Sequence, residues 1–262
     1  MTNTTPPGWM SHIIKPVTGP DDPELQETLE EGLSQIEAKD LVAIADDLVE
    51  KHRLFRERLA SPEQVGALTE EDWAWLAANV TAARRHARAL QEQVPLDVAR
   101  AAIHALLFTP GPPARRVADF VGLIGVDDAR LALELATGLL HFTQPQDHWL
   151  WTRWLWDVKT NTGILPLLAG SVRNLIAEDI AQGYVNVGAI TAMSMRFAEG
   201  TGLLTPDLTE HPERRTFAAD AFLSCAYCVY LYGITSWRLS REFHRLLPPL
   251  PKLARRILGI RY

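Results

Sequence analysis

The sequence predicts an all-α fold, in the form of a single compact bundle of about ten helices. Apolar residues recur at helical spacing along most of the 262 residues. No segment keeps the strict apolar–polar alternation of a half-buried strand between hairpin turns. Prolines and glycines lie between the periodic segments and form no low-complexity block, so the loops are short and no linker divides the chain. Helices joined by short loops bury their apolar faces by packing into a bundle.

The first half of the chain is predicted to form an arm followed by five or six helices. Residues 1–22 are rich in Thr, Pro and Gly and are expected to be a flexible arm, and the all-α domain is expected to span 23–262. Asp22 can cap a helix that begins at Pro23. Thr69 caps another helix, with three acidic residues in its first turn. The remaining helices are predicted at about 39–59, 96–108, 113–123 and 127–142.

The second half is predicted to continue with helices at about 146–160, 165–182 and 187–199. The loop "GTGLLTPDLTEHPE" then leads into a helix that carries both cysteines of the chain. A short helix and a basic tail, at about 250–262, follow the sequence "RLLPPLP".

The charges are distributed unevenly. Residues 1–75 hold sixteen acidic and six basic side chains, a balance of −10, whereas residues 238–262 hold seven basic side chains and one acidic, a balance of +6. An acidic body argues against a nucleic-acid-binding protein. The basic tail suits an acidic partner or peripheral contact with a membrane surface. The alternative is a last helix packed through Leu253, Ile257 and Ile260 with its arginines in solvent.

The compartment is predicted to be the cytoplasm. The first residues show no secretory signal pattern, and two cysteines without an export signal are expected to stay reduced. The longest uncharged stretch in the later chain, 221–237, is interpreted as a buried helix and not as a transmembrane segment.

Cys225 and Cys228 are the first candidate site. At positions i and i+3 of a helix they share one face, with Tyr232 beside them, and such a pair can cycle between dithiol and disulfide. The alternative is two small residues filling a core, because free cysteine is among the most buried residue types. Two cysteines alone do not make a zinc site.

The stretch "ERRTFAADAFLSCAYCVYLY" resembles the active-site helix of the AhpD / carboxymuconolactone decarboxylase-like family, which is all-α. The resemblance implies a thiol oxidoreductase in which Cys228 attacks, Cys225 resolves and Glu213 relays a proton. Position 232 is Tyr where the family carries His. An unbroken helix would place Glu213 about 22 Å from Cys228, so the relay requires a break between them.

The segment "HWLWTRWLWD" is the second candidate site. On a helix, Trp149 and Trp156 share one face, Arg153 lies between them and can pair with Asp157, and Trp154 lies nearly opposite. Such a segment can form an aromatic wall for an apolar ligand or an anchor for a partner. His148, with His141 and Asp147, precedes it and can line the mouth of a pocket. The alternative is a helix buried among its neighbours.

Other sequence patterns argue against metal or cofactor chemistry. Asp46 and Glu50 imitate a magnesium-binding motif, but they point away from the apolar stripe of Leu41, Leu48 and Phe55. His52 lies in that stripe and is interpreted as a buried histidine with a backbone partner. No phosphate loop, dinucleotide-binding, zinc-protease or di-iron motif occurs, so we expect no cofactor and no metal.

Two functions remain open from the sequence. One is thiol-redox activity through the paired cysteines. The other is a non-catalytic binding or assembly subunit that holds a protein partner or an apolar small molecule through the Trp-rich helix and the basic tail. In either case we expect a homo-oligomer without nucleic acid.

Overall fold

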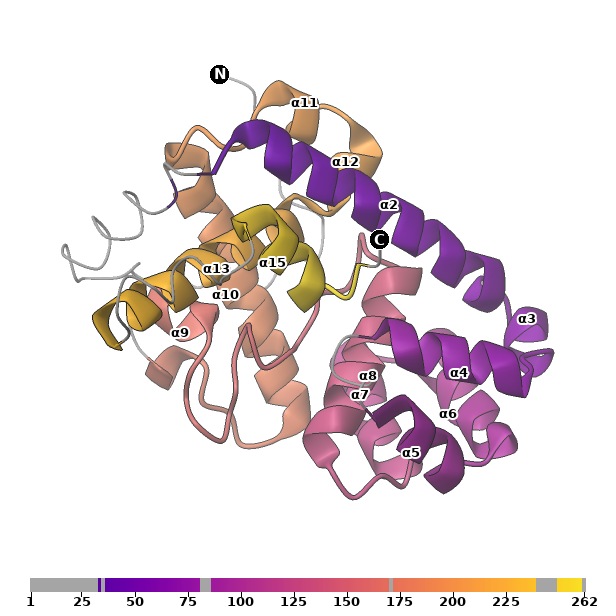
Figure 1. The fold of residues 1–262 in the computed structure, drawn as a ribbon. Helices are drawn as coiled ribbons and strands as arrows, with labels where there is room; N and C mark the ends of the chain where they lie inside the picture. The colour runs from indigo at the N-terminus through magenta and orange to yellow at the C-terminus, as the bar shows by residue number, and fades with distance from the viewer. Residues whose placement is uncertain (1–32, 34–35, 81–85, 170–171, 239–248, 261–262) are drawn as a thin grey trace. The chain divides into compact units, whose positions relative to one another are not determined.

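The computed structural model describes residues 33, 36–80, 86–169, 172–238 and 249–260, without the side chains of 172 and 232–238 (Figure 1). In these ranges the all-α prediction is confirmed, because the regular elements are helices and none is a strand. The predicted arm at 1–22 lies outside the described residues, and the domain limits stay a prediction. The α-helices are α2 (Ala38–Leu59), α3 (Pro62–Gly66), α4 (Glu70–Asn79), α5 (Ala87–Gln93), α6 (Leu96–Phe108), α7 (Pro113–Leu123), α8 (Ala129–Thr143), α9 (Ile164–Leu168), α10 (Ile180–Gly200), α11 (Pro206–Thr209), α12 (Pro212–Thr216), α13 (Ala218–Arg238) and α15 (Leu250–Ile257), with a 3-10 helix at Val172–Asn174.

The described residues group into two compact units. Unit 1 contains Glu50–Thr152 and Ile176–Ala189, and unit 2 contains 33–49, Arg153–Leu175 and the described part of Ile190–Tyr262. Helices α2 and α10 contribute residues to both units.

Unit 1 is built around α8. Every side chain from Leu131 to Thr143 is buried, and α6 and α7 pack on this helix and on each other. Helix α4 starts with the predicted cap at Thr69, whose hydroxyl accepts from the Asp72 backbone N–H at 3.1 Å while the Asp72 carboxylate accepts from the Thr69 N–H at 3.0 Å. This reciprocal box satisfies two backbone donors that an uncapped helix leaves unpaired.

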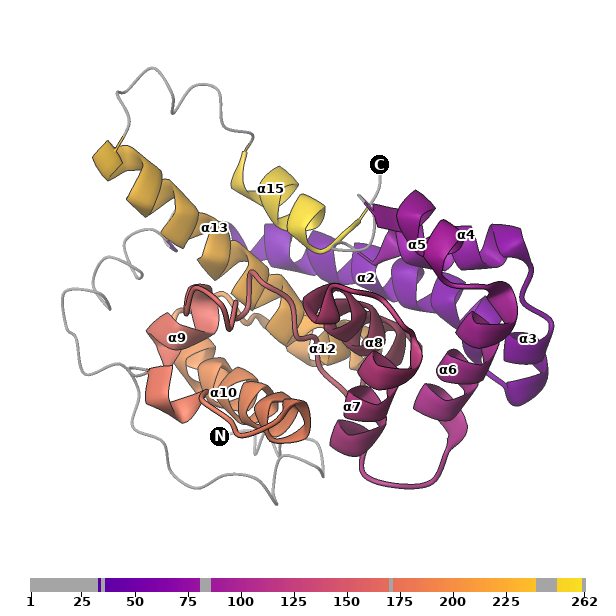
Figure 2. The same cartoon turned by 90° about the horizontal axis from the view of Figure 1, so that it is seen from below.

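Unit 2 is built around α13, which contacts α9, α12 and α15; Figure 2 shows α15 alongside α13. Two neighbouring aspartates of α2 hold other elements in place. Asp46 forms a two-pronged ion pair with Arg214 of α12, at 2.6 and 3.1 Å. Asp47 accepts from Arg255 of α15 at 2.6 Å. The sequence "DD" therefore serves as a clamp for α12 and α15.

The predicted helix at 146–160 is wrong. Helix α8 ends at Thr143, and the chain from Trp149 to Gly163 is irregular. Its backbone groups pair across a hairpin-like loop: Ile164 N donates to Trp154 O and Leu165 N to Leu155 O, both at 3.0 Å. A helix here would carry Trp side chains on two opposite faces, and both faces would need to be buried by neighbouring elements. An irregular chain can direct each indole into a different part of the core.

The predicted helices at 165–182 and 187–199 also differ from the structure. Helix α9 ends at Leu168, and α10 runs without interruption from Ile180 to Gly200. Asp179 explains why α10 begins at Ile180, because its carboxylate accepts a hydrogen bond from the Gln182 N–H at 2.8 Å, as a helix cap does.

No helix in the described part of the chain combines the length and the apolar character that crossing a lipid bilayer demands.

Candidate functional site

The two thiols lie in the middle of α13 and are inaccessible to solvent. Cys225 and Cys228 are free and both have an exposed fraction of 0%. Burial, followed by the negative charge of Asp40, raises the pKa of Cys225 to about 12, and burial raises the pKa of Cys228 as well. At neutral pH both side chains are therefore thiols, whereas the thiolate is the form that attacks a disulfide or peroxide.

The other residues of the predicted thiol site lie in different surroundings. Glu213 belongs to α12 and is exposed, and the helix breaks at Phe217 before α13 begins. The break that a proton relay requires is therefore present, but the carboxylate is in solvent while both thiols are buried. The side chain of Tyr232 lies outside the described residues. The resemblance to the AhpD-like family and its redox chemistry stay a prediction.

Trp149 and Trp151 pack against two glycines of α10. A Cβ atom at Gly188 would lie 2.7 Å from Trp149 Cδ2, and one at Gly183 would lie 2.9 Å from Trp151 Cζ3, with other ring atoms closer still. The Trp149 indole also stacks on Tyr184, with ring centroids 4.5 Å apart, and its Nε1–H donates to Tyr184 O at 2.8 Å. Both indoles therefore form part of the core of unit 1.

Trp154 and Trp156, which belong to the hairpin-like loop of unit 2, are also buried. Trp154 lies beside Tyr227 of α13, with ring centroids 6.1 Å apart. Gly163 closes the loop with a φ of 127°, and a Cβ atom there would meet the Leu155 carbonyl carbon at 2.7 Å. Only glycine adopts this conformation in this space without strain.

The accessible side chains of the Trp-rich segment are charged, and an exposed apolar side chain follows them in the loop. Arg153 is exposed, and Asp157 is half-buried, with its N–H bonded to Thr162 O at 2.8 Å. Val158, at the tip of the loop, is 49% exposed. A partner that approaches this segment meets these side chains and the loop tip, because the four indoles are covered.

His148 belongs to a buried polar cluster in unit 1. Its backbone carbonyl accepts from His141 Nδ1 at 2.7 Å, and its own Nε2 lies 3.2 Å from Gln144 Oε1. Among the described residues its Nδ1 has no hydrogen-bond partner. Burial lowers the pKa of His148 to about 3, and the nearby Arg116 guanidinium and His141 add to the effect. His148 is thus neutral at physiological pH, and its side chain is only 4% exposed.

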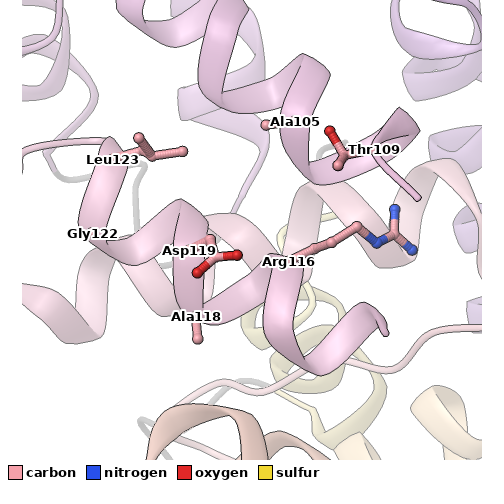
Figure 3. A pocket seen from close by; sticks show the side chains of 7 residues that line it. All are labelled: Ala105, Thr109, Arg116, Ala118, Asp119, Gly122 and Leu123. Carbon is pink, nitrogen blue, oxygen red and sulfur yellow. The ribbon is translucent and has the colours of Figure 1, made fainter. Parts of the chain in front are cut away.

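A groove of about 470 Å³ lies between α6 and α7 (Figure 3). Small or apolar side chains form most of its lining, and three polar side chains complete it. The lining residues are Ala105, Thr109, Arg116, Ala118, Asp119, Gly122 and Leu123. Arg116 donates from Nη1 to the carbonyls of Leu106 and Leu107, at 2.5 and 3.1 Å, and so caps the C-terminal end of α6.

Helix α15 presents a basic edge on unit 2. Lys252 and Arg256 are exposed, and Leu253 and Ile257 beside them are half-buried. The inner face of the helix, with Ala254, is buried against α13, as Leu258 is just after the helix.

The acidic residues of α2 face outward, as predicted. Asp46 and Glu50 are exposed and form ion pairs with Arg214 and Arg53. Within the described ranges no group of His, Cys, Asp and Glu is arranged to hold a metal ion. The prediction for His52 is confirmed in its contact, since Nδ1 lies 2.8 Å from Phe142 O, although the ring is only half-buried.

The α6–α7 groove and the ion pair between Asp47 and Arg255 were not predicted from the sequence. The groove arises where small residues fall on facing sides of two antiparallel helices, a pattern that shows only after the helices are paired. The ion pair joins residues 208 positions apart in the sequence, so no local pattern indicates it. The spacing of Gly183 and Gly188 was the one local signal for the packing of the indoles, because glycine inside a helix usually marks a close approach.

Comparison of the chain with protein-family models, with curated proteins and with solved structures found no match. The structure by itself defines an all-α protein with two compact units, buried thiols, a groove on unit 1 and a basic edge on unit 2.

Proposed function

We propose that this protein acts by binding an acidic protein partner through the outer edge of α15, in the cytoplasm, and not by turning over a substrate with its thiols. The observation that carries the proposal is the way α15 is held. Its inner face is packed on α13 and Arg255 is anchored to Asp47, so Lys252 and Arg256 are displayed at fixed positions.

The charge on this edge favours an acidic partner. The eight residues of α15 include three basic and no acidic side chains, and Arg255 forms an internal ion pair with Asp47. Complementary charge across an interface accelerates encounter and selects the partner, while half-buried apolar side chains such as Leu253 and Ile257 add contact area. A lipid surface is less suited, because Leu253 and Ile257 are half-buried and only their outer parts are accessible for insertion.

The buried thiols support the choice of binding over catalysis. A reactive cysteine is an accessible thiolate, whereas Cys225 and Cys228 are covered and have raised pKa values. In the cytoplasm such thiols rest as structural residues of the core.

The test compares a charge-reversed α15 with a matched control. Lys252→Glu/Arg256→Glu reverses the edge and leaves Arg255 in place. Lys159→Glu/Arg196→Glu reverses two exposed basic residues of the same unit elsewhere. A partner captured by cross-linking in the source cells is purified, and its affinity is measured by titration calorimetry. We expect the first variant to bind at least tenfold more weakly and the control to bind like the unmodified chain.

Two results would oppose the proposal. Equal binding by the α15 variant excludes this edge as the contact. Loss of the cellular function in Cys225→Ala/Cys228→Ala, with binding intact, assigns the function to the thiols instead.

The partner proposed here includes the case of a second copy, in line with the predicted homo-oligomer, because residues 1–75 carry an acidic balance of −10. Sedimentation of the unmodified chain and the α15 variant at low and high salt separates this case from a foreign partner. Self-association that α15 mediates is weakened by the charge reversal and by salt.

A further inference from the structure

The α6–α7 groove has a polar end and an apolar end. The two helices are antiparallel and joined by the short loop 109–112, so Thr109 and Arg116 lie together near the loop. Gly122 and Leu123 lie two turns further along α7, roughly 10 Å from Arg116 along the helix axis. Figure 3 shows Arg116 and Leu123 at opposite ends of the labelled set.

The polar end carries a cation, Arg116, that forms no ion pair with a carboxylate in the described part of the chain. The hydrogen bonds of Arg116 go from Nη1 to two neutral carbonyls, and its Nε–H is buried without a hydrogen-bond partner among the described residues. Asp119 lines the middle of the groove, about one turn further along α7, and its carboxylate pairs with Arg115 at 3.0 Å (Figure 3). Burial lowers the pKa of Arg116, which is the effect of removing a guanidinium from water without adding a carboxylate. An anion bound there would restore the missing charge compensation.

The apolar end offers open space beside small side chains. Ala105, Ala118 and Gly122 leave room between the helices, and Leu123 is 55% exposed at the rim. A Cβ atom added at Gly122 would meet nothing within 4 Å. An exposed leucine at the edge of a groove gains contact area when an apolar chain lies beside it.

We propose that this groove binds a small amphiphilic carboxylate, with the carboxylate on Arg116 and Thr109 and the apolar chain along Ala105, Ala118 and Leu123. The volume of about 470 Å³ lies in the range of small-molecule sites. This site lies on unit 1 and is independent of the binding edge on α15.

The probe is octanoate, titrated into the full chain and followed by the methyl NMR signals of Ala105, Ala118 and Leu123. We expect saturable shifts of these methyl groups at millimolar concentration, because a ligand of this size makes few contacts in a shallow groove. Octylamine has the same chain with a positive head group, and we expect at least tenfold weaker binding.

Two variants separate the ligand site from the capping role of Arg116. Arg116→Gln removes the charge and should weaken octanoate binding at least tenfold, the effect of losing a charge-assisted hydrogen bond. Because this change also affects the cap of α6, Gly122→Leu fills the groove while leaving Arg116 in place, and should abolish the shifts. Gly66→Leu, at another helical glycine with open space around it, is the matched control and should bind like the unmodified chain.

The inference is overturned if octanoate produces no saturable shift, if octylamine binds equally well, or if Gly122→Leu binds octanoate as the Gly66→Leu control does.

Discussion

Replacing Gly188 by Ala should destabilise the protein, although alanine is the better helix former. The added methyl group would enter the Trp149 indole, with Cδ2 only 2.7 Å away and Cε2 and Cζ2 closer. The indole has no room to withdraw, because it is stacked on Tyr184, is bonded to Tyr184 O at 2.8 Å and is only 8% exposed.

Two alternative costs and one opposing gain set the expected change in the free energy of unfolding. Overpacking a core costs about 1–3 kcal/mol. If the indole turns away instead, it leaves a buried donor unpaired and loses its stacking partner, which costs a similar amount. The change from Gly to Ala inside α10 contributes about 1 kcal/mol in the other direction. The middle of the overpacking range less the gain in helix propensity predicts that Gly188→Ala lowers the free energy of unfolding by about 1 kcal/mol.

The assay is urea denaturation followed by tryptophan fluorescence, with an unchanged m-value as the sign that only stability has altered. Gly122→Ala in α7 is the control, because its Cβ atom lies in open space and only helix propensity acts. It should raise the free energy of unfolding by up to about 1 kcal/mol.

A double-mutant cycle with Trp149→Phe tests the cause. The smaller ring makes room for the methyl group, so the cost of Gly188→Ala should shrink by about 1 kcal/mol in that background. The reasoning fails if Gly188→Ala stabilises the chain as Gly122→Ala does, or if the two costs simply add.

Three more predictions concern the two thiols, His148 and the capping residue Asp72. Alkylation of Cys225 and Cys228 at pH 8 should be at least a hundredfold slower in the native chain than in urea, since both thiols are buried with raised pKa values; rapid labelling of the native protein would favour the redox hypothesis. The pKa of His148 is about 3 in the folded chain and about 6.5 in the unfolded chain. The stability that depends on its neutral form is therefore fully present above pH 6.5. It declines by about 1.4 kcal/mol per pH unit as the pH falls from 6.5 toward 3. His148→Gln should flatten the unfolding free energy between pH 6 and pH 4, and an unchanged slope there would show that His148 is not buried in its neutral form. Hydrogen bonds from the backbone and hydroxyl of Thr69 lower the pKa of Asp72, so its contribution is present above the unfolded pKa of about 4 and disappears in acid. Asp72→Ala should cost about 1 kcal/mol at pH 7 and little at pH 2, and an equal loss at both would disprove the ionic basis of the cap.

The candidate sites were predictable only in part. Both cysteines and the whole Trp-rich segment stand out by composition, and their interpretation as core residues was one of the alternatives that the sequence left open. Glu213 was tied to the thiols by a family resemblance, yet it lies in solvent on another helix. The groove beside Arg116 has no sequence motif, because it depends on which faces of α6 and α7 meet.

The sequence by itself determined where most helices form. The prediction of 96–108 matches α6, and Thr69 caps α4 as expected. The outward direction of Asp46 follows from the apolar stripe of α2. These features rest on interactions within four residues of each other, namely apolar periodicity, capping hydrogen bonds and first-turn charges, so the local sequence contains all that they need.

Only the tertiary structure decided the path of the chain from Trp149 to Gly163. Its composition is compatible with a helix. Its conformation depends on the close packing of Trp149 on Gly188, on the contact of Trp154 with Tyr227 of α13, and on the positive φ of Gly163. Burying large indoles against distant partners is worth several kcal/mol, whereas helix propensity differs by less than about 1 kcal/mol per residue. The distant contacts therefore outweigh the local preference, and no local pattern contains them.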